Sequence, residues 1–253
     1  MERSMPNFES LSADKHSQLF VDEQKLIATF AKQHMVHVEV AECVNASTEF
    51  ALFFSRIANG KGWTVSALCS FVPGQNLFSP SAEQWTAHYT PMSLRTLPLS
   101  MQYDEQNQST VMLDTAHSAV SSHHGEALYN AANRPTPYLS NKLKQLDERV
   151  SAFAQTQSIL ANAEKLGLIQ PVDLILEFAN GEQQRINGLA TVNENALKGL
   201  SAQTLHELNT QGVLAPMYSL LGSILQVNRL IRLHNGRYPE NQIKNIKFET
   251  SKS

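Results

Sequence analysis

Two Asn-Gly dipeptides, Asn59-Gly60 and Asn180-Gly181, constrain the fold of this chain more than any other feature. Each lies between two runs rich in β-branched and aromatic residues. Asn-Gly supplies the positive φ angles of a tight turn between antiparallel strands. The sequence therefore predicts two antiparallel β-hairpins, at residues 50–71 and 172–192, with Ile175 interrupting the alternation of the second.

A long helix is predicted between the hairpins, from about residue 137 to residue 166. Apolar residues recur there at alternating steps of four and three, which is typical of one buried stripe. The stripe consists of Leu139, Leu143, Leu146, Val150, Phe153, Gln157 and Leu160. Gly167 can end the helix. A short coiled coil fits the same spacing, but we expect a helix that packs on its own sheet.

Weaker patterns predict the remaining elements. A strand pair is expected at 97–103 and 110–114, and Ser201 can cap a helix that Gly212 ends. A last helix is expected to carry Met217, Leu221, Ile224 and Leu225 on one side, whereas residues 1–33 are polar and poorly patterned. The expected class is α+β, with antiparallel hairpins packed with a long helix and C-terminal helices. We expect a single domain over 1–253 with a frayed, polar tail at 235–253.

Composition excludes several functional classes. The chain has 253 residues, of which 42% are hydrophobic, and a formal net charge of -3. A chain of this length needs no disulfide or metal to stabilise it, and it has no basic excess for nucleic acid. Cys43 and Cys69 lie among apolar residues and are expected to be buried, unreactive thiols.

The sequence does not predict a membrane protein. Residues 1–16 lack the apolar core of a Sec signal peptide. The uncharged stretch 208–228 is the best candidate for a membrane span, but its apolar part is shorter than the roughly 20 residues that a bilayer requires. We expect a buried amphipathic helix there and a cytoplasmic protein.

One histidine motif was tested as a metal site. His124 and Glu126 are spaced like two ligands of a facial iron triad, which His206 or His234 could complete. They lie in a Ser/Gly/Asn-rich loop, which is a poor scaffold for a metal. We therefore expect no metal and no other cofactor. Motifs for a nucleophile elbow, a P-loop or a dinucleotide site are also missing from the sequence.

The densest group of possible ligand-binding side chains follows the loop "FVPGQNLFSP" at 71–80. It contains two aromatic residues and a cation, which can hold a peptide or a small anion. The predicted binding residues are Gln75, Asn76, Trp85, His88, Tyr89 and Arg95. The alternative is structural, with Trp85 and Tyr89 at the edge of the core and Arg95 paired with an acid.

Several segments together resemble the bacterial SapC family over about residues 5–233. They are "MPNFESLSADKH", "AKQHMVHV", "ALCSFVPGQNLFSP", "WTAHYTPMSLRTLP", "RPTPYL", "LGLIQPVDLILEFANGEQQRINGLATVNENALKGLSAQTLHEL" and "GVLAPMYSLLGSILQVNRLIRL". Gln75 stands where the family commonly has an acid, and Thr96 where it has a second arginine. The segment "SAVSSHHGE" matches no family segment.

The resemblance implies a link with bacterial surface-layer systems but supplies no catalytic residues. Genes of this family often lie beside flavin-dependent tryptophan halogenase-like proteins, cupin-like hydroxylases and TonB-dependent receptors. The function expected first is therefore a non-enzymatic accessory or binding protein with a protein or peptide partner. An enzyme of unknown reaction is the second alternative, with a metal oxygenase as its concrete form. A structural surface-layer component is the third.

Overall fold

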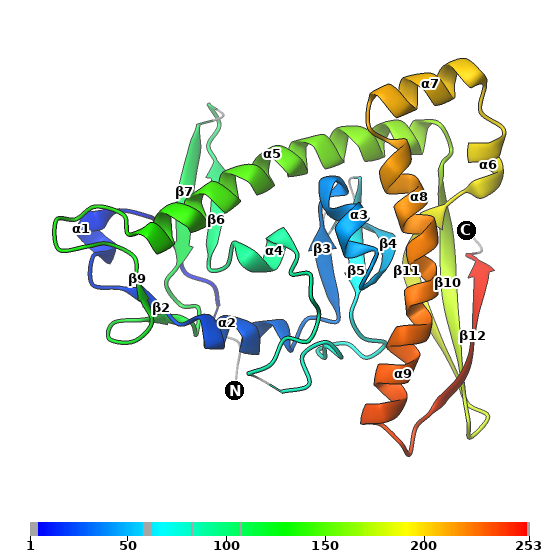
Figure 1. Ribbon diagram of the computed structural model, residues 1–253, viewed down its shortest axis with the longest axis horizontal. Coiled ribbons are helices and arrows are strands. Elements are labelled where there is room, and N and C mark those ends of the chain that lie inside the picture. The colour runs from blue at the N-terminus through cyan, green and yellow to red at the C-terminus, as the bar shows by residue number, and fades with distance from the viewer. Residues whose placement is uncertain (1–4, 58–61, 82, 107, 252–253) are drawn as a thin grey trace. The chain divides into compact units, whose positions relative to one another are not determined.

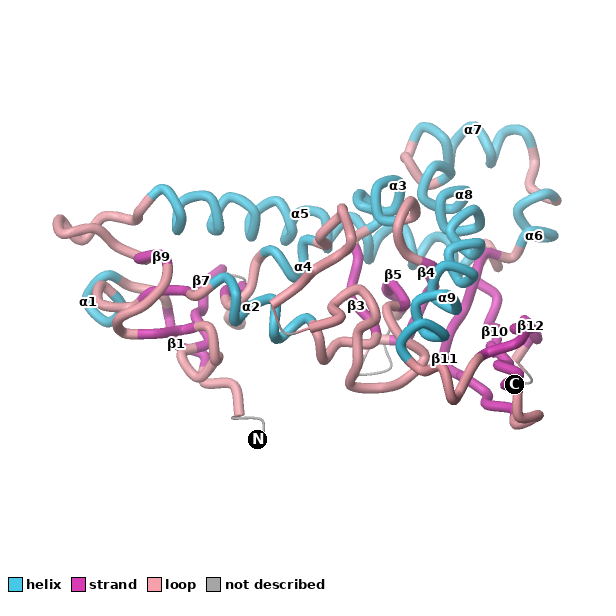
Figure 2. Tube along the Cα trace, turned by 60° about the horizontal axis from the view of Figure 1, so that its bottom comes forward, coloured by secondary structure: helices cyan, strands magenta, loops and turns pink. Residues whose placement is uncertain are grey.

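The computed structural model describes residues 5–57, 62–81, 83–106 and 108–251, which form helices and antiparallel sheets of an α+β protein. These residues group into two compact units (Figures 1 and 2). The first unit comprises the described residues within 1–32, 79–86 and 92–151, and the second those within 33–78, 87–91 and 152–253. The expectation of one domain over 1–253 stays a prediction.

The first unit contains two small antiparallel sheets. One has the strand order β1-β7-β6, and the other has the order β8-β2-β9. The strands are β1 (Phe8–Ser10), β2 (Phe20–Val21), β6 (Leu99–Tyr103), β7 (Ser109–Asp114), β8 (Val120–Ser121) and β9 (Glu126–Ala127). The helices are α1 (Ala13–His16), α2 (Glu23–Phe30), α4 (Met92–Arg95) and the first half of α5 (Pro137–Lys165). The predicted pairing of the strands now called β6 and β7 is confirmed.

Residues 5–33 are more regular than the sequence indicated. They contain β1, α1, β2 and α2, although the strands are only two or three residues long. Strands of that length show no readable alternation, so their existence depends on distant partners. Asp22 begins α2, because its carboxylate accepts a hydrogen bond from the backbone N–H of Gln24 at 3.0 Å.

The second unit is built on a six-stranded antiparallel sheet with the order β12-β10-β11-β4-β5-β3. The strands are β3 (Met35–Val38), β4 (Ala51–Arg56), β5 (Trp63–Leu68), β10 (Ile169–Phe178), β11 (Gln183–Val192) and β12 (Ile243–Thr250). Helices α8 (Leu214–Ser223) and α9 (Val227–Arg237) contact this sheet, and Figure 1 shows them in front of it. The remaining helices are η1 (Val40–Glu42), α3 (Cys43–Ala46), α6 (Glu194–Lys198), α7 (Ala202–Thr210) and η2 (Ile224–Gln226).

Both predicted hairpins are present. β4 pairs with β5, and β10 pairs with β11. Gly181 has a positive φ angle of +87° but Asn180 does not, and the N–H of Gly181 donates to the carbonyl of Phe178 at 3.0 Å. The connection is therefore a longer turn with one left-handed residue, whereas Asn59-Gly60 lies outside the described residues. Ile175 interrupts the alternation because β10 is an inner strand whose residues 172–176 are buried on both faces.

The predicted long helix is α5, which ends in a Schellman motif at Gly167. The N–H of Leu168 donates to the carbonyl of Ala163 at 2.9 Å, and Gly167 has a φ of +68°. The predicted stripe is only partly buried, because Phe153 is 44% exposed. Thr156 is buried instead, and its hydroxyl accepts a hydrogen bond from the N–H of Val40 at 2.9 Å.

Two predictions about the C-terminal region are wrong. The last helix is interrupted by η2, so Leu225 leaves the buried side and is 73% exposed. The tail is not frayed throughout, because residues 243–250 form β12 along β10. The sequence of β12 is polar since most of its residues are exposed.

Ser201 caps α7 as predicted, which gives a first test of the fold. Its hydroxyl accepts a hydrogen bond from the N–H of Thr204 at 3.1 Å. We expect Ser201→Ala to lower the free energy of unfolding by about 1 kcal/mol, which corresponds to a melting shift of roughly 2–4 °C. Ser201→Asp retains an acceptor and should melt like the wild type. Equal melting of the alanine variant and the wild type would show that this cap contributes nothing.

Candidate functional site

The six predicted binding residues are divided between the two units. Trp85 and Arg95 belong to the first unit, and the other four belong to the second. The half-buried ring of Trp85 meets the ring of Phe30 edge-on, with centroids 5.8 Å apart. Arg95 lies at the end of α4, and its backbone carbonyl accepts a hydrogen bond from Lys142 Nζ at 2.8 Å.

Gln75 and Asn76 hold the loop that contains them. The side chain of Asn76 is buried, and its Oδ1 accepts a hydrogen bond from the N–H of Phe78 at 2.9 Å. Gln75 Oε1 accepts a hydrogen bond from the hydroxyl of Tyr238. Gly74 has a φ of +78°, as a type II turn requires. Both side chains therefore stabilise the loop, and a role of theirs in ligand binding stays a prediction.

Tyr89 and His88 have different surroundings. The hydroxyl of Tyr89 donates to Glu42 Oε1 at 2.6 Å, which is a strong, charge-assisted hydrogen bond. His88 is exposed. Within the second unit, Tyr89 therefore supports η1, and the predicted binding role of these two residues remains untested.

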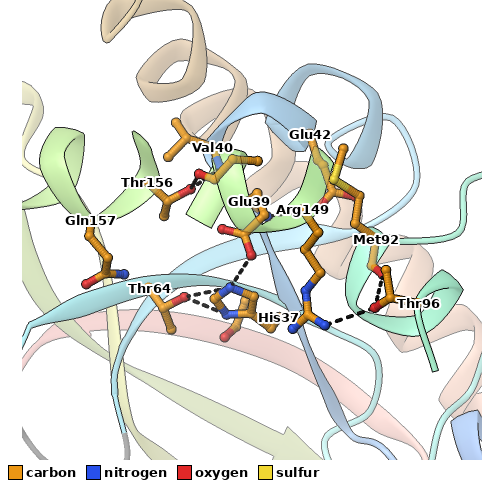
Figure 3. Close-up of polar contacts among 12 residues, drawn as sticks. His37, Glu39, Val40, Glu42, Thr64, Met92, Thr96, Arg149, Thr156 and Gln157 are labelled. Carbon is orange, nitrogen blue, oxygen red and sulfur yellow. Dashed lines mark hydrogen bonds and ion pairs between the residues drawn. The ribbon is translucent and has the colours of Figure 1, made fainter. Parts of the chain in front are cut away.

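A polar cluster around β3 and η1 contains the most triad-like arrangement of the second unit (Figure 3). His37 Nε2 lies 2.8 Å from Glu39 Oε1, and His37 Nδ1 lies 2.6 Å from Thr64 Oγ1. Thr64 Oγ1 also lies 3.5 Å from Nε2. An oxygen in line with the Nδ1 lone pair would be about 4.5 Å or more from Nε2. The hydroxyl therefore lies beside the ring, and this geometry is not that of an activated nucleophile.

Burial also argues against nucleophilic chemistry at this cluster. Glu39 and Glu42 are almost completely buried, and Thr64 is nearly so. Glu42 Oε2 accepts a hydrogen bond from the N–H of Glu39 at 2.9 Å, which closes a capping box at η1. The cluster therefore joins β3, β5 and η1.

The His-Gly-Glu motif has a structural explanation. A Cβ on Gly125 would lie 2.4 Å from the carbonyl oxygen of Val21, so glycine permits the close approach of β9 to β2. His124 is exposed, and its Nε2 lies 3.8 Å from Asp22 Oδ2. Among the described residues, no three His, Cys, Asp or Glu side chains gather as a metal site would need.

His206 and His234, the two other histidines considered for that site, differ in burial. His206 is exposed. His234 is buried between aromatic rings, and its Nε2 lies 3.0 Å from the carbonyl oxygen of Asn241, to which it donates. Burial lowers the pKa of His234. It therefore acts as a neutral core histidine that holds the segment leading into β12.

Cys43 and Cys69 are both fully buried, as predicted. Burial, with smaller contributions from Glu42 and Glu39, raises the pKa of Cys43 to about 12. Burial alone raises the pKa of Cys69. We expect neither thiol to react with a water-soluble disulfide reagent at pH 8 in the folded protein, because thiolate is the reactive form. Both should react in denaturant, and prompt reaction of the folded protein would contradict their burial.

A cavity of about 350 Å³ lies in the second unit and is lined by residues of β10, β11, β12, α6, α8 and η2. Its wall is more polar than apolar, and the apolar part includes Leu221 of α8, Ile224 of η2, Val172 of β10 and Phe248 of β12. This volume is at the small end of ligand sites and suits one or two apolar side chains. Thr191 also lines the cavity, but its hydroxyl is buried and has no hydrogen-bond partner among the described residues.

Charges at the rim of this cavity are paired within the chain. Lys198 Nζ lies 3.0 Å from Glu194 Oε2 on α6. Glu249 Oε2 lies 2.7 Å from Arg185 Nη2. Because these charges neutralise one another, the cavity favours an uncharged ligand group.

An exposed apolar surface continues along the helix that lines the cavity. We call it the α8 face, and it consists of Ala215, Tyr218, Gly222 and Leu225. These residues recur at helical steps of three and four, and all are exposed. Tyr218 and Leu225 are among the most exposed large apolar side chains of the described residues. No charged residue occurs anywhere in 208–228, so the face has no charges of its own.

Sequence reasoning missed the α8 face, although its signal was present. The uncharged stretch 208–228 was considered as a membrane span and then interpreted as a buried helix. None of the helices among the described residues is long and apolar enough to cross a membrane. A larger cavity, of about 630 Å³, lies along α5 and has a mixed wall that includes Gln155, Asn162, Ile159 and Val213.

Comparison with known proteins gives a family and no nearer relative. The family model SapC matches residues 11–230. Neither the curated proteins nor the solved structures contain a significant match.

Proposed function

This chain belongs to the SapC family, and we propose that it is a non-enzymatic accessory protein that binds an apolar segment of a protein partner. The observation that carries the proposal is the α8 face with its adjoining cavity. Exposed apolar patches rimmed by polar groups are typical of protein-binding sites. Tyrosine, the residue type of Tyr218, is enriched among the few residues that supply most of the binding energy at such sites.

The chemistry of the face supports a particular kind of partner. A charged segment would lose its hydration against residues 208–228 without gaining an opposite charge. An apolar side chain of the partner can enter the cavity and contact Leu221, Ile224 and Phe248.

The partner classes that we propose are those implied by the family resemblance. They are a flavin-dependent tryptophan halogenase-like enzyme and a TonB-dependent receptor. On this proposal the protein would act on the modifying enzyme or the receptor by binding it, without catalysing a reaction itself.

Co-purification of defined proteins tests the proposal. Each candidate partner from the source bacterium is produced with an affinity tag, mixed with this chain at micromolar concentration and recovered on resin. We expect one of them to retain this chain, and a tagged protein of unrelated fold to retain none. If neither candidate retains it and calorimetry detects no binding at 100 µM, the proposed partners are wrong.

A further inference from the structure

The outer edge of β12 is open. β12 is the last strand in the order β12-β10-β11-β4-β5-β3, and it pairs only with β10 among the described residues. Alternate backbone N–H and C=O groups of an edge strand point away from the sheet, where they can pair with another strand. Lysine on edge strands usually opposes such pairing, so the side chains decide which strand is accepted.

The side chains of β12 are complementary to those of a second, antiparallel copy of β12. A two-fold axis at Phe248, perpendicular to the sheet, places each Phe248 opposite its counterpart. It also places Lys247 opposite Glu249 of the second copy, and this pair occurs twice. Residues 246 and 250 then face each other as Ile and Thr. A register centred on Lys247 would instead place two lysines opposite each other, which is destabilising.

On one face of the sheet, this pairing would extend a row of alternating charges that each copy already contains. Lys247 contacts Glu177 of β10, and Glu249 Oε2 lies 2.7 Å from Arg185 Nη2 of β11. Across the axis the charges would alternate as Glu177, Lys247, then Glu249 and Arg185 of the second copy. On the other face, the 42% exposed ring of Phe248 would be covered by its counterpart.

We propose that two copies of this chain form a symmetric dimer by antiparallel pairing of β12 about Phe248. The dimer joins two six-stranded sheets into one continuous sheet. The dimer shares Phe248, Glu249 and Thr250 with the wall of the cavity, but not the α8 face, and its test uses this chain alone. An interface of one short strand pair is small, so the dimer should be reversible, with a dissociation constant on the order of micromolar.

Charge variants that are mixed after purification test the register directly. In a homodimer of Lys247→Glu, the new glutamate lies opposite Glu249 of the other copy. In a homodimer of Glu249→Lys, the new lysine lies opposite Lys247 of the other copy. Each variant should therefore be a monomer in sedimentation velocity at 100 µM, whereas the wild type should be a dimer that dissociates on dilution. Mixed in equal amounts, the two variants should form a heterodimer, since both cross-strand pairs are then Glu with Lys.

The same experiment also shows whether the variants are folded. Each variant replaces one intrachain ion pair by a like-charge contact, with Glu177 or with Arg185, at exposed or half-buried positions. Its melting temperature should therefore fall by no more than a few degrees. A heterodimer formed on mixing shows that both variants are folded. The proposal is overturned if the wild type is a monomer at 100 µM, or if both variants remain dimers by themselves. Two monomeric variants that do not associate on mixing also contradict this register.

Discussion

Replacing Phe78 with alanine is expected to lower the free energy of unfolding by about 3–5 kcal/mol, the largest stability effect predicted for this protein. Phe78 is buried, and its ring meets Phe50 edge-on with centroids 4.7 Å apart. The guanidinium of Arg229 lies 5.3 Å from the same ring. Truncation would leave a cavity under the loop 71–80, which Phe78 attaches to the core.

Urea unfolding followed by tryptophan fluorescence measures this effect. Trp63 lies in the same unit as Phe78, and Trp85 lies in the other. A Trp85→Phe background therefore reports the unit that contains the substitution. Phe153→Ala is the matched control, because its ring is 44% exposed, and it should cost less than about 1 kcal/mol. Similar costs for the two variants would show that Phe78 does not anchor the loop.

Local sequence signals predicted those parts of the fold that have local causes. The hairpin 172–192 follows from the turn at Asn180-Gly181, and the end of α5 follows from Gly167. Such turns need particular φ angles, which few residues other than glycine adopt. The helix cap at Ser201 was predictable for a similar reason.

The parts that were missed depend on distant partners. β12 is polar and exposed on most of its length, so only its pairing with β10 makes it a strand. The two-residue strand β2 exists because β8 and β9 flank it. Neither case leaves a periodic pattern in the sequence, since alternation arises from burial of one face.

The binding role of the residues predicted around the loop 71–80 stays a prediction. Two of them, Asn76 and Tyr89, each make a hydrogen bond that stabilises local structure. The α8 face was missed because an apolar helix is normally buried. Its exposure at Tyr218 and Leu225 arises from the packing of α8 and from the break at η2, which the sequence alone does not reveal.

Leu225→Asp is expected to remove partner binding while leaving the fold intact. The side chain is 73% exposed, so the free protein loses little packing. In a complex, the carboxylate would be buried against an uncharged surface without a partner. Together with the lost apolar contact, this should weaken binding at least about 30-fold, as is typical of an interface hot spot.

Phe153→Asp is the matched control for this substitution. It also places a carboxylate on an exposed apolar position of the second unit, but on α5 and not on α8. We expect it to bind the partner as the wild type does. Both variants should melt within about 2 °C of the wild type, as exposed substitutions normally do.

Titration of a co-purified partner with the wild type, Leu225→Asp and Phe153→Asp is the most direct test of the central claim. Isothermal calorimetry at one salt concentration gives the three dissociation constants, and circular dichroism confirms that the variants are folded. The account predicts weakening of at least about 30-fold for Leu225→Asp alone. Equal affinity of the wild type and Leu225→Asp for that partner would show that the α8 face is not its binding site.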